Sequence, residues 1–272
     1  MYKQPFPIVL LSVFKSGTEM MKRIVEDLTG LSSMEPEITP GKVNYMDASK
    51  LFYPDGGFYA WHLFPTKEVQ ESLMLHQARP VFIMRNIYDL AVSMYYQFAN
   101  NIDADVGRGR NVDHYFKSIS KNDGFSGIIE GMLKPDFVWK GVGPHFRQME
   151  LMLEFAEVYP CFVTSYEDMT KRKPEEVQRL ANFLQINLDE KTLEKIVFNS
   201  RFDVMKAHAI RQNTSSHFRK GVSGSHVEEL TVDHIHKIRN ELCSHAPMLP
   251  SLLEAANLSH VLEVNSIFKA SH

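Results

Sequence analysis

Short runs of apolar residues alternate with longer amphipathic segments along this chain. From Thr18 onward, apolar residues recur at helical spacing as far as Leu31, which predicts an amphipathic helix that Gly30 helps to end. Buried strands are predicted at residues 8–13, 58–63, 80–84 and 161–164. Further helices are predicted over residues 66–76, 89–100, 146–159, 174–184, 188–199 and 231–245. We expect loop-rich structure over residues 35–57 and irregular structure over residues 101–144.

Buried strands that alternate with helices indicate a parallel sheet, because the helices carry the chain back from the end of one strand to the start of the next. The pattern therefore predicts an α/β fold with a mainly parallel sheet flanked by helices on both faces. With 272 residues and 44% apolar content, the chain is expected to form a single domain over residues 1–272. A ligand of such a sheet binds beyond the carboxyl ends of the strands.

Charge and cysteine content narrow the function classes. The formal net charge is −3, so there is no overall positive field and no reason to expect a nucleic-acid partner. No run of 18 apolar residues occurs, so we expect no membrane span. Two cysteines, Cys161 and Cys243, are too few for a disulfide framework or a metal-binding cluster. These features favour a cytoplasmic location and leave the oligomeric state open.

The first strand runs into a turn whose residues suit an anion, in the order Lys15-Ser16-Gly17-Thr18. Because this turn opens a helix, backbone N–H groups and the positive end of the helix dipole point at the place where an anion would sit. The Lys adds a positive charge and the two hydroxyls add donors. The order differs from that of a Walker A loop, in which the Lys follows the second Gly. An ordinary strand-to-helix turn is the alternative interpretation.

Four polar residues lie at the ends of the four predicted strands or just after them, namely Lys15, His62, Arg85 and Tyr166. Since parallel strands end at the same edge of a sheet, we expect these residues at one edge. His62 is the candidate general base because an imidazole titrates near neutral pH, with a structural histidine as the alternative. Tyr166 is a candidate for stacking on a nucleotide base, with an ordinary turn as the alternative.

Two further segments have the composition of phosphate contacts. Arg85 and Ser93 lie eight residues apart, across the start of a predicted helix, and an Arg can hold a phosphate by two hydrogen bonds. The alternative is that Arg85 pairs with Asp89 and that Ser93 lies on a solvated helix face. The run Arg219-Lys220-Gly221 combines two cations with a backbone N–H that a phosphate can approach, and a solvated basic loop is its alternative.

Together these segments resemble the cytosolic type of sulfotransferase, which uses 3′-phosphoadenosine 5′-phosphosulfate (PAPS). The first loop of that family, Tyr-Pro-Lys-Ser-Gly-Thr-Thr-Trp, is similar to residues 13–20, Val-Phe-Lys-Ser-Gly-Thr-Glu-Met. Its Lys-Thr-His-Leu-Pro motif resembles residues 60–65, and its Arg-Asn-Pro-x-Asp-x-x-Val-Ser motif resembles residues 85–93. Its Tyr-Glu-Asp-Met and Arg-Lys-Gly-x-x-Gly motifs occur at residues 166–169 and 219–224. The five motifs keep the order of the family.

The chain also departs from the family pattern. The first loop lacks the Pro, the second Thr and the Trp, and Ala60 stands where a Lys often assists the sulfonyl group. After the last motif, Ser225-His226 replaces the usual Trp-Lys. Val227 and His236 stand in place of the Lys and Glu of the dimer motif. The resemblance therefore carries more weight for cofactor binding than for acceptor or dimer geometry.

The resemblance implies in-line transfer of a sulfonyl group from PAPS to a hydroxyl, or less readily an amine, of a small-molecule, lipid or glycan acceptor. His62 would take the acceptor proton, while Lys15 and nearby N–H groups would stabilise charge on the transferring group. The sequence contains no cluster of carboxylates that indicates a metal site, and we expect no bound metal. The cofactor-binding residues that the resemblance implies are Lys15, Ser16, Gly17, Thr18, Arg85, Ser93, Tyr166, Arg219, Lys220 and Gly221.

The acceptor pocket is expected in the stretch from residue 98 to residue 146 and its surroundings, which is rich in aromatic residues. Such a wall suits a lipid, phenol or other apolar alcohol, but the same rings can simply fill a core. His145 lies near the position of a family histidine that flanks the acceptor. The candidate wall residues are Tyr95, Tyr96, Tyr115, Phe116, Phe125, Phe137 and Trp139.

Two other function classes stay open at this point. A P-loop kinase of a small molecule or nucleoside should have a Lys after the loop Gly and a Mg²⁺-holding Asp at a strand end, and neither is evident. An inactive relative would bind an adenosine bisphosphate without chemistry. The presence of Lys15 and His62 argues against an inactive relative, whereas the lost Lys and Trp of the family motifs keep that class open.

Overall fold

Five strands form one parallel sheet in this computed structural model, which describes residues 6–34, 57–100, 112–134, 137–211, 221 and 223–264. The strand order is β2-β3-β1-β4-β7, and every neighbouring pair is parallel. The strands are β1 (Ile8–Ser12), β2 (Ser32–Met34), β3 (Gly57–Trp61), β4 (Arg79–Met84) and β7 (Phe162–Ser165). A short antiparallel hairpin pairs β5 (Met132–Lys134) with β6 (Phe137–Trp139). The predicted α/β class with a mainly parallel sheet is confirmed.

The helices in the described part of the chain are α1 (Thr18–Thr29), α2 (Lys67–Leu75), α3 (Ile87–Ala99), α4 (Val112–Ser118), α5 (Lys121–Glu130), α6 (Gly143–Val158), α7 (Tyr166–Lys171), α8 (Lys173–Phe183), α9 (Glu190–Asn199), α10 (Phe202–Arg211), α11 (His226–Glu229), α12 (Val232–His245), α13 (Leu249–Ala255) and the 3-10 helix η4 (Ser259–Leu262). Contacts divide the chain into two compact units. Unit 1 comprises Met1–Glu37, Asn44–Met84 and Leu151–Gly221, and unit 2 comprises Ile38–Val43, Arg85–Glu150 and Val222–His272. The single domain over residues 1–272 stays a prediction.

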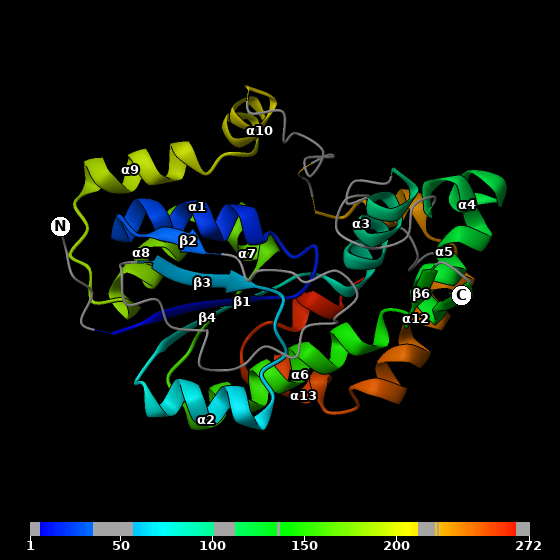
Figure 1. The fold of residues 1–272 in the computed structure, drawn as a ribbon, viewed down its shortest axis with the longest axis horizontal. Helices are drawn as coiled ribbons and strands as arrows, with labels where there is room; N and C mark the ends of the chain where they lie inside the picture. The colour runs from blue at the N-terminus through cyan, green and yellow to red at the C-terminus, as the bar shows by residue number, and fades with distance from the viewer. Residues whose placement is uncertain are drawn as a thin grey trace. The chain divides into compact units, whose positions relative to one another are not determined.

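Unit 1 is a layered α/β body whose central strands, β1 and β4, are buried on both faces. Leu10 of β1 faces the same hydrophobic cluster as Ile24 of α1 and Leu180 of α8. On the other face, the ring of Phe82 lies 6.4 Å from that of Phe155 in α6. Figure 1 shows α1 and α8 on one side of the sheet and α2 on the other. Burial on both faces explains why these strands are continuous apolar runs rather than alternating ones.

The register of the sheet brings the carboxyl ends of its strands to one edge. Leu10 of β1 pairs with Ala60 of β3 on one side and with Val81 of β4 on the other. The parallel β4–β7 pair ends at Met84 and Ser165. Lys15, His62, Arg85 and Tyr166 each follow a strand of this parallel sheet in sequence, and their gathering at one edge stays a prediction. That edge is where an α/β sheet binds ligands.

Unit 2 is built around α3. Its aromatic residues pack tightly, and the rings of Tyr95 and Phe125 stack with centroids 4.2 Å apart. Asn86 caps the helix, because its side-chain oxygen accepts hydrogen bonds from the N–H groups of Tyr88 and Asp89. The amide of Asn86 also donates to the carbonyl of Glu263 at 2.9 Å, which ties the C-terminal part of the chain to this cap.

The prediction of irregular structure over residues 101–144 is wrong for the described part, which contains α4, α5 and the β5–β6 hairpin. Two glycines make α5 hard to recognise from the sequence, and each of them packs closely against a side chain from elsewhere in the fold. A Cβ at Gly124 would come within 2.7 Å of the Tyr95 ring, and one at Gly127 within 2.7 Å of the sulfur of Met132. The sequence pattern also missed β2, α10 and α13. Residues 35–56 and 101–111 lie outside the described residues.

Candidate active site

The loop between β1 and α1 is held by Ser16. Its N–H donates to Val13 O at 3.0 Å, and its hydroxyl lies 2.6 Å from Val13 O and 3.0 Å from Ile83 O. These contacts fix the turn against β4 and use the Ser16 hydroxyl as a donor to backbone. Ser16 therefore shapes the loop in this structure, and its contact with a cofactor stays a prediction.

The same loop leaves the N-terminus of α1 without a side-chain cap. The N-cap residue is Gly17, which has no side chain to offer and adopts a left-handed conformation with φ of +98°. Lys15 is also left-handed, with φ of +69°. The first N–H groups of a helix have no acceptor within the helix, and α3 meets this need with Asn86 whereas α1 has no such side chain. An uncapped helix N-terminus beside a Lys is the arrangement that binds an anion.

Tyr166 supports this loop from the end of β7. Its ring lies so close to Gly17 that a Cβ at that position would come within 2.7 Å of Tyr166 Cδ2. Tyr166 is also largely buried, with 8% of its surface exposed. The loop therefore needs glycine at this position for two reasons, its left-handed backbone and its contact with the tyrosine ring.

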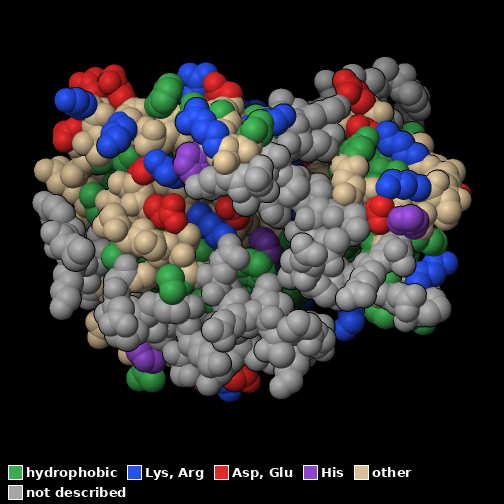
Figure 2. Space-filling view, turned by 45° about the horizontal axis from the view of Figure 1, so that its top comes forward, with side chains coloured by type: hydrophobic (Ala, Val, Ile, Leu, Met, Phe, Trp, Pro, Cys, Tyr) green, Lys and Arg blue, Asp and Glu red, His purple; other side chains and the backbone are tan. Residues whose placement is uncertain are grey.

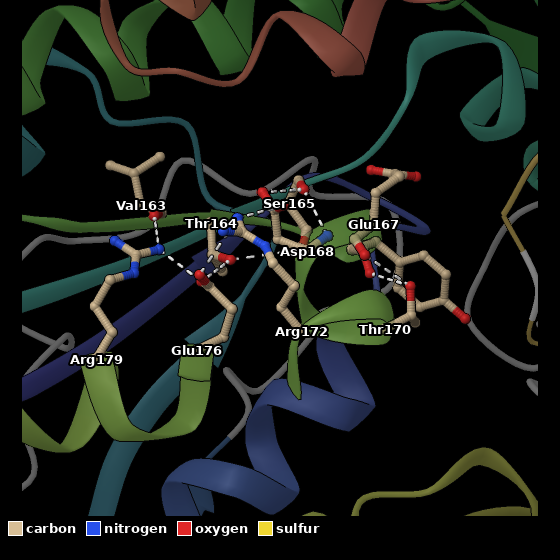
Figure 3. Close-up of polar contacts among 10 residues, drawn as sticks. Val163, Thr164, Ser165, Glu167, Asp168, Thr170, Arg172, Glu176 and Arg179 are labelled. Atoms are coloured by element: carbon tan, nitrogen blue, oxygen red, sulfur yellow. Dashed lines mark hydrogen bonds and ion pairs between the residues drawn. The ribbon is translucent and has the colours of Figure 1, made fainter. Parts of the chain in front are cut away.

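A polar network fixes the start of α7, where Tyr166 lies (Figure 3). Ser165 caps the helix by accepting a hydrogen bond from the N–H of Asp168, and its hydroxyl donates to Asp168 Oδ2 at 2.9 Å. Arg172 binds the other carboxylate oxygen at 2.8 Å. Nearby, the buried Glu176 accepts from the hydroxyl of Thr164 at 2.7 Å. Asp168 is thus paired with Ser165 and Arg172 around this turn.

His62 lies directly after β3 and is held by Ser12 of β1. Its Nδ1 is 3.0 Å from Ser12 Oγ and 3.2 Å from Ser12 O. The Phe14 ring meets the imidazole edge to face, with centroids 5.3 Å apart. Lys15 Nζ lies 5.8 Å from the centroid of the same Phe14 ring. The structure therefore brings the two predicted catalytic residues, Lys15 and His62, to one aromatic ring within unit 1.

In unit 2, Asp89 lies within the Arg85–Ser93 motif and is held by several hydrogen bonds. This fully buried carboxylate accepts hydrogen bonds from the N–H and Nδ1 of His226, both at 3.0 Å. Burial tends to raise the pKa of Asp89, but the hydrogen bond from His226, the charge of Arg85 and the N–H of Gly224 lower it to about 2. The charge of Arg85 thus acts on the Asp89 carboxylate, and Ser93 is half-buried on α3.

The Asp89 contacts fasten the segment that follows the late basic motif. Ser225 also donates to Asp89, at 3.2 Å, so residues 223–226 are tied to the first turn of α3. Within unit 1, Gly221 lies against Phe202, since a Cβ there would come within 2.2 Å of that ring. Arg219 and Lys220 lie outside the described residues. Sequence reasoning missed both contacts, and no local pattern signals them.

The proposed aromatic wall divides into two groups. Tyr95, Phe116 and Phe125 are 7%, 4% and 1% exposed, so they fill the core of unit 2. Two half-buried rings of this wall also make hydrogen bonds. Trp139 donates to Ile128 O at 2.7 Å, and Tyr96 donates to the carboxylate of Glu229 at 2.9 Å. His145 stacks on Trp139, with centroids 5.5 Å apart. The three core rings therefore match the packing alternative rather than an open pocket.

On the face shown in Figure 2, positive and negative side chains are interspersed rather than gathered by sign. Within the described ranges, no three His, Cys, Asp or Glu residues are grouped as metal ligands. Among the same residues, no helix is long and apolar enough to cross a bilayer.

Comparison with known proteins identifies the family. Residues 5–244 match the family model described as the sulfotransferase domain. This chain belongs to the sulfotransferase family. Sulfotransferase 1B1 of the dog, Canis lupus familiaris, is 22% identical over 261 residues, or 85% of this chain and 80% of the relative. Sulfotransferase 1 family member D1 of the rat, Rattus norvegicus, is 24% identical over 65% of this chain and 58% of its own length. The resemblance inferred from the five motifs is confirmed, and the chain is an enzyme of this family.

Solved sulfotransferase structures share the fold. A mouse sulfotransferase, SULT7A1, complexed with PAP, has a TM-score of 0.66 and 19% identity over 93% of this chain and 88% of that one. Retinol dehydratase in complex with androsterone and the inactive cofactor PAP has a TM-score of 0.61 and 16% identity over 90% of this chain and 82% of that one. The P-loop-like sulfotransferase fold predicted for this chain is confirmed.

Proposed function

We propose that this protein transfers a sulfonyl group from PAPS to a hydroxyl of a small-molecule acceptor, with an amine as a less favoured acceptor. The observation that carries the proposal is the uncapped N-terminus of α1 beside Lys15, with His62 oriented on Ser12 at the same edge of the sheet. An anion site next to an imidazole of fixed orientation suits transfer from an anionic donor. Family membership and the order of the motifs support the same conclusion.

The donor would be held mainly by the loop and by basic residues. Lys15, Gly17 and Thr18 would bind the phosphate that leaves with the nucleotide, through charge, N–H groups and a hydroxyl. Arg85 and Ser93 would contact the 3′-phosphate. The remaining contacts implied by the motifs are those of Ser16, Tyr166, Arg219, Lys220 and Gly221. PAP in the related structures is the product that PAPS leaves behind, which supports this choice of donor.

The chemistry would be an in-line displacement at sulfur. The acceptor oxygen forms a bond to sulfur while the bond between sulfur and the phosphate oxygen breaks, and that electron pair stays on the phosphate. His62 Nε2 takes the acceptor proton as attack proceeds. Lys15 and the N–H groups of the first turn of α1 stabilise the growing negative charge on the leaving phosphate. No step in this sequence needs a metal.

Apolar alcohols are the acceptors that fit this proposal best. Structures of retinol dehydratase contain androsterone and retinol, both of which are apolar molecules that carry a hydroxyl. The half-buried rings of Tyr115 and Phe137 in unit 2 are candidates for contact with such a molecule. A lipid alcohol, a steroid or a phenol is therefore preferred to a highly charged glycan.

A kinase and an inactive nucleotide-binding relative are the remaining alternatives. The kinase is disfavoured because the Lys of this loop precedes its glycine, unlike the Lys of a Walker A loop. The inactive relative is disfavoured because His62 is oriented by two contacts to Ser12, which a binding site without chemistry does not require.

We also propose a cytoplasmic location. Cys161 and Cys243 are both free thiols, and Cys243 is exposed. Exposed free thiols persist in a reducing compartment.

The experiment is to incubate the protein with PAPS and, in turn, androsterone, retinol and a simple phenol, and to detect sulfated product and PAP by mass spectrometry. A sulfated product that depends on the enzyme is expected with at least one acceptor. His62→Ala should lower turnover by roughly 10²–10⁴-fold at nearly unchanged PAP affinity. The matched control is His76→Ala, an exposed histidine at the C-cap of α2, which should keep full turnover.

PAP binding without sulfated product from any acceptor class, including amines, would favour the inactive relative. Near-normal turnover of a folded His62→Ala variant would remove this histidine from the mechanism. Loss of folding in that variant, with His76→Ala intact, would support the structural interpretation of His62.

A further inference from the structure

A chain of three side chains joins the anion-binding helix to the candidate base. Thr18 Oγ1, in the first residue of α1, lies 2.8 Å from Ser12 Oγ. Ser12 Oγ in turn lies 3.0 Å from His62 Nδ1. Ser12 is fully buried and Thr18 is 8% exposed, so neither hydroxyl is surrounded by water. All three residues belong to unit 1.

The direction of this chain decides which nitrogen of His62 carries the proton. A hydroxyl has one hydrogen, so Ser12 can donate either to Thr18 or to His62, but not fully to both. If Ser12 donates to His62, Nδ1 must be the unprotonated nitrogen and Nε2 carries the hydrogen. If Ser12 donates to Thr18, it must accept from an Nδ1–H, and Nε2 keeps its lone pair. Only the second tautomer can act as a base through Nε2.

Two further contacts among the described residues bear on the direction of the Ser12 hydroxyl. Trp61 O also lies near Ser12 Oγ, but at 3.5 Å this is the limit of a hydrogen bond. Ser12 O lies 3.2 Å from His62 Nδ1, and a carbonyl can only accept, so this contact exists only when Nδ1 carries hydrogen. The contacts around Ser12 therefore allow both directions and lean toward the tautomer with Nδ1–H.

We infer that an anion bound at the N-terminus of α1 fixes the direction of the Thr18–Ser12–His62 chain and so prepares His62 as a base. An anion can only accept, so it takes the hydrogen of Thr18. Thr18 then accepts from Ser12, Ser12 accepts from Nδ1–H, and the lone pair stays on Nε2. The ring loses a hydrogen at Nε2 to water and gains one at Nδ1 from water, so the step leaves its charge unchanged. The inference rests on the proposed function, since the anion is the phosphate of the donor.

Ser12 is thus a positioning residue that makes the base depend on the donor. Before the donor binds, the neutral imidazole divides between two tautomers. After it binds, the chain selects the form that can take a proton from the acceptor. Cooperative hydrogen bonding strengthens the effect, because each donor in the chain is polarised by the next. The loop that binds the leaving group therefore also tunes the residue that activates the nucleophile.

The test is nuclear magnetic resonance of protein that carries ¹⁵N-labelled histidine, with and without saturating PAP, at about pH 8, where an unperturbed imidazole is neutral. The His62 signals are assigned among the twelve histidines by comparison with His62→Gln. The couplings between ring hydrogens and ring nitrogens report which nitrogen carries hydrogen. On addition of PAP we expect His62 to change from a mixture to the form with Nδ1–H alone.

Variants can show whether PAP acts on His62 through the Thr18–Ser12–His62 hydrogen bonds or through a general effect of binding. Ser12→Ala should bind PAP with unchanged affinity, and its His62 tautomer should no longer respond to PAP. Thr18→Val should lose the response and bind PAP on the order of tenfold more weakly, whereas Thr18→Ser should keep both. The matched control is Thr29→Val at the other end of α1, whose hydroxyl donates to Val25 O at 2.6 Å. This control should respond to PAP like the unmodified protein.

Failure of the inference can be told apart from failure of the proposed function. If PAP does not bind the unmodified protein, the proposed function fails and the inference fails with it. If PAP binds and the His62 tautomer is the same in both states, the inference alone is overturned. A full response in Ser12→Ala would overturn it as well, because the signal would then reach His62 by another route.

Discussion

The ring of Tyr166 touches the backbone of Gly17, and a Cβ on that glycine would lie 2.7 Å from Tyr166 Cδ2. This contact joins the residue after β7 to the loop after β1. The same glycine is the N-cap of α1 and has φ of +98°. The shape of the anion loop thus depends on a glycine that both the backbone conformation and the neighbouring ring require.

We expect Gly17→Ala to disrupt nucleotide binding. The added methyl group must move the Tyr166 ring and hold a left-handed backbone, which together cost on the order of 1–3 kcal/mol in stability. Since the loop N–H groups would shift, PAP affinity should fall by about tenfold or more. Calorimetric titration with PAP and urea unfolding measure the two effects.

Gly30→Ala is the matched control for that substitution. Gly30 ends α1, also has positive φ, at +69°, and has nothing within 4 Å of an added Cβ. It should cost about 1 kcal/mol in stability and leave PAP affinity unchanged. Equal losses of PAP affinity in the two variants would contradict the role given to the Gly17 contact.

Asp89→Asn should destabilise the fold. Asp89 receives hydrogen bonds from the N–H and the ring of His226, and an amide cannot accept all of the donors that face the carboxylate. Leaving a buried hydrogen-bond donor without its acceptor costs on the order of 1–3 kcal/mol. Urea unfolding at neutral pH checks this value. The exposed Asp203→Asn, next to Arg201, should change the unfolding midpoint little.

The acid sensitivity of the protein follows from the same residue. The pKa of Asp89 is about 2 in the folded protein and about 3.9 in an unfolded chain. The stabilisation is therefore present above pH 4 and is lost as the pH falls from about 4 through 2, by an amount on the order of 2 kcal/mol. Asp89→Asn should lack this part of the acid loss. An identical pH dependence of unfolding in both proteins would refute the assignment.

Arg85→Ala should change the affinity for two nucleotides to different extents. If Arg85 holds the 3′-phosphate, the variant should bind adenosine 3′,5′-bisphosphate more weakly by about 1.5–3 kcal/mol and adenosine 5′-phosphate nearly as before. Calorimetry with both nucleotides measures the difference. Arg23→Ala, which removes a partly exposed arginine of α1 paired with Asp27, is the control. Equal weakening for both nucleotides in Arg85→Ala would reject a specific 3′-phosphate contact.

The two cysteines should differ strongly in reactivity. Burial raises the pKa of the Cys161 thiol to about 12, so almost no thiolate forms at neutral pH. Cys243 is exposed. Iodoacetamide followed by peptide mass spectrometry should therefore label Cys243 first and Cys161 only after unfolding. Early labelling of Cys161 in the folded protein would show that its surroundings are more open than described.

Much of the sheet could be predicted because its strands are local apolar runs. Strands buried on both faces need no alternation, so residues 80–84 and 161–164 stood out from their neighbours. Helix α5 could not be predicted in this way, because Gly124 and Gly127 are typical helix breakers. Their role depends on Tyr95 and Met132, which lie elsewhere in the chain. Contacts of this kind are not encoded in local sequence.

The residues of the candidate site fall into two similar groups, those that local sequence indicates and those whose partners are distant in the sequence. His62 and Arg85 could be predicted because each directly follows a strand whose end is evident in the sequence. The contact of Ser12 with His62 spans 50 positions, and that of Asp89 with His226 spans 137. A serine that ends a strand and an aspartate in the first turn of a helix are both ordinary residues. Their importance is visible only after the fold brings their partners to them.

The central claim is that the loop after β1 holds a PAPS-type nucleotide. Calorimetric titration with PAP, in parallel with ATP plus Mg²⁺, tests it most directly. Lys15→Met should weaken PAP binding, and Lys67→Met, an exposed lysine of α2, should not. The account predicts that PAP binds at one site per chain in the presence of EDTA and that ATP plus Mg²⁺ binds far more weakly. Tight binding of ATP plus Mg²⁺ with no binding of PAP would contradict it.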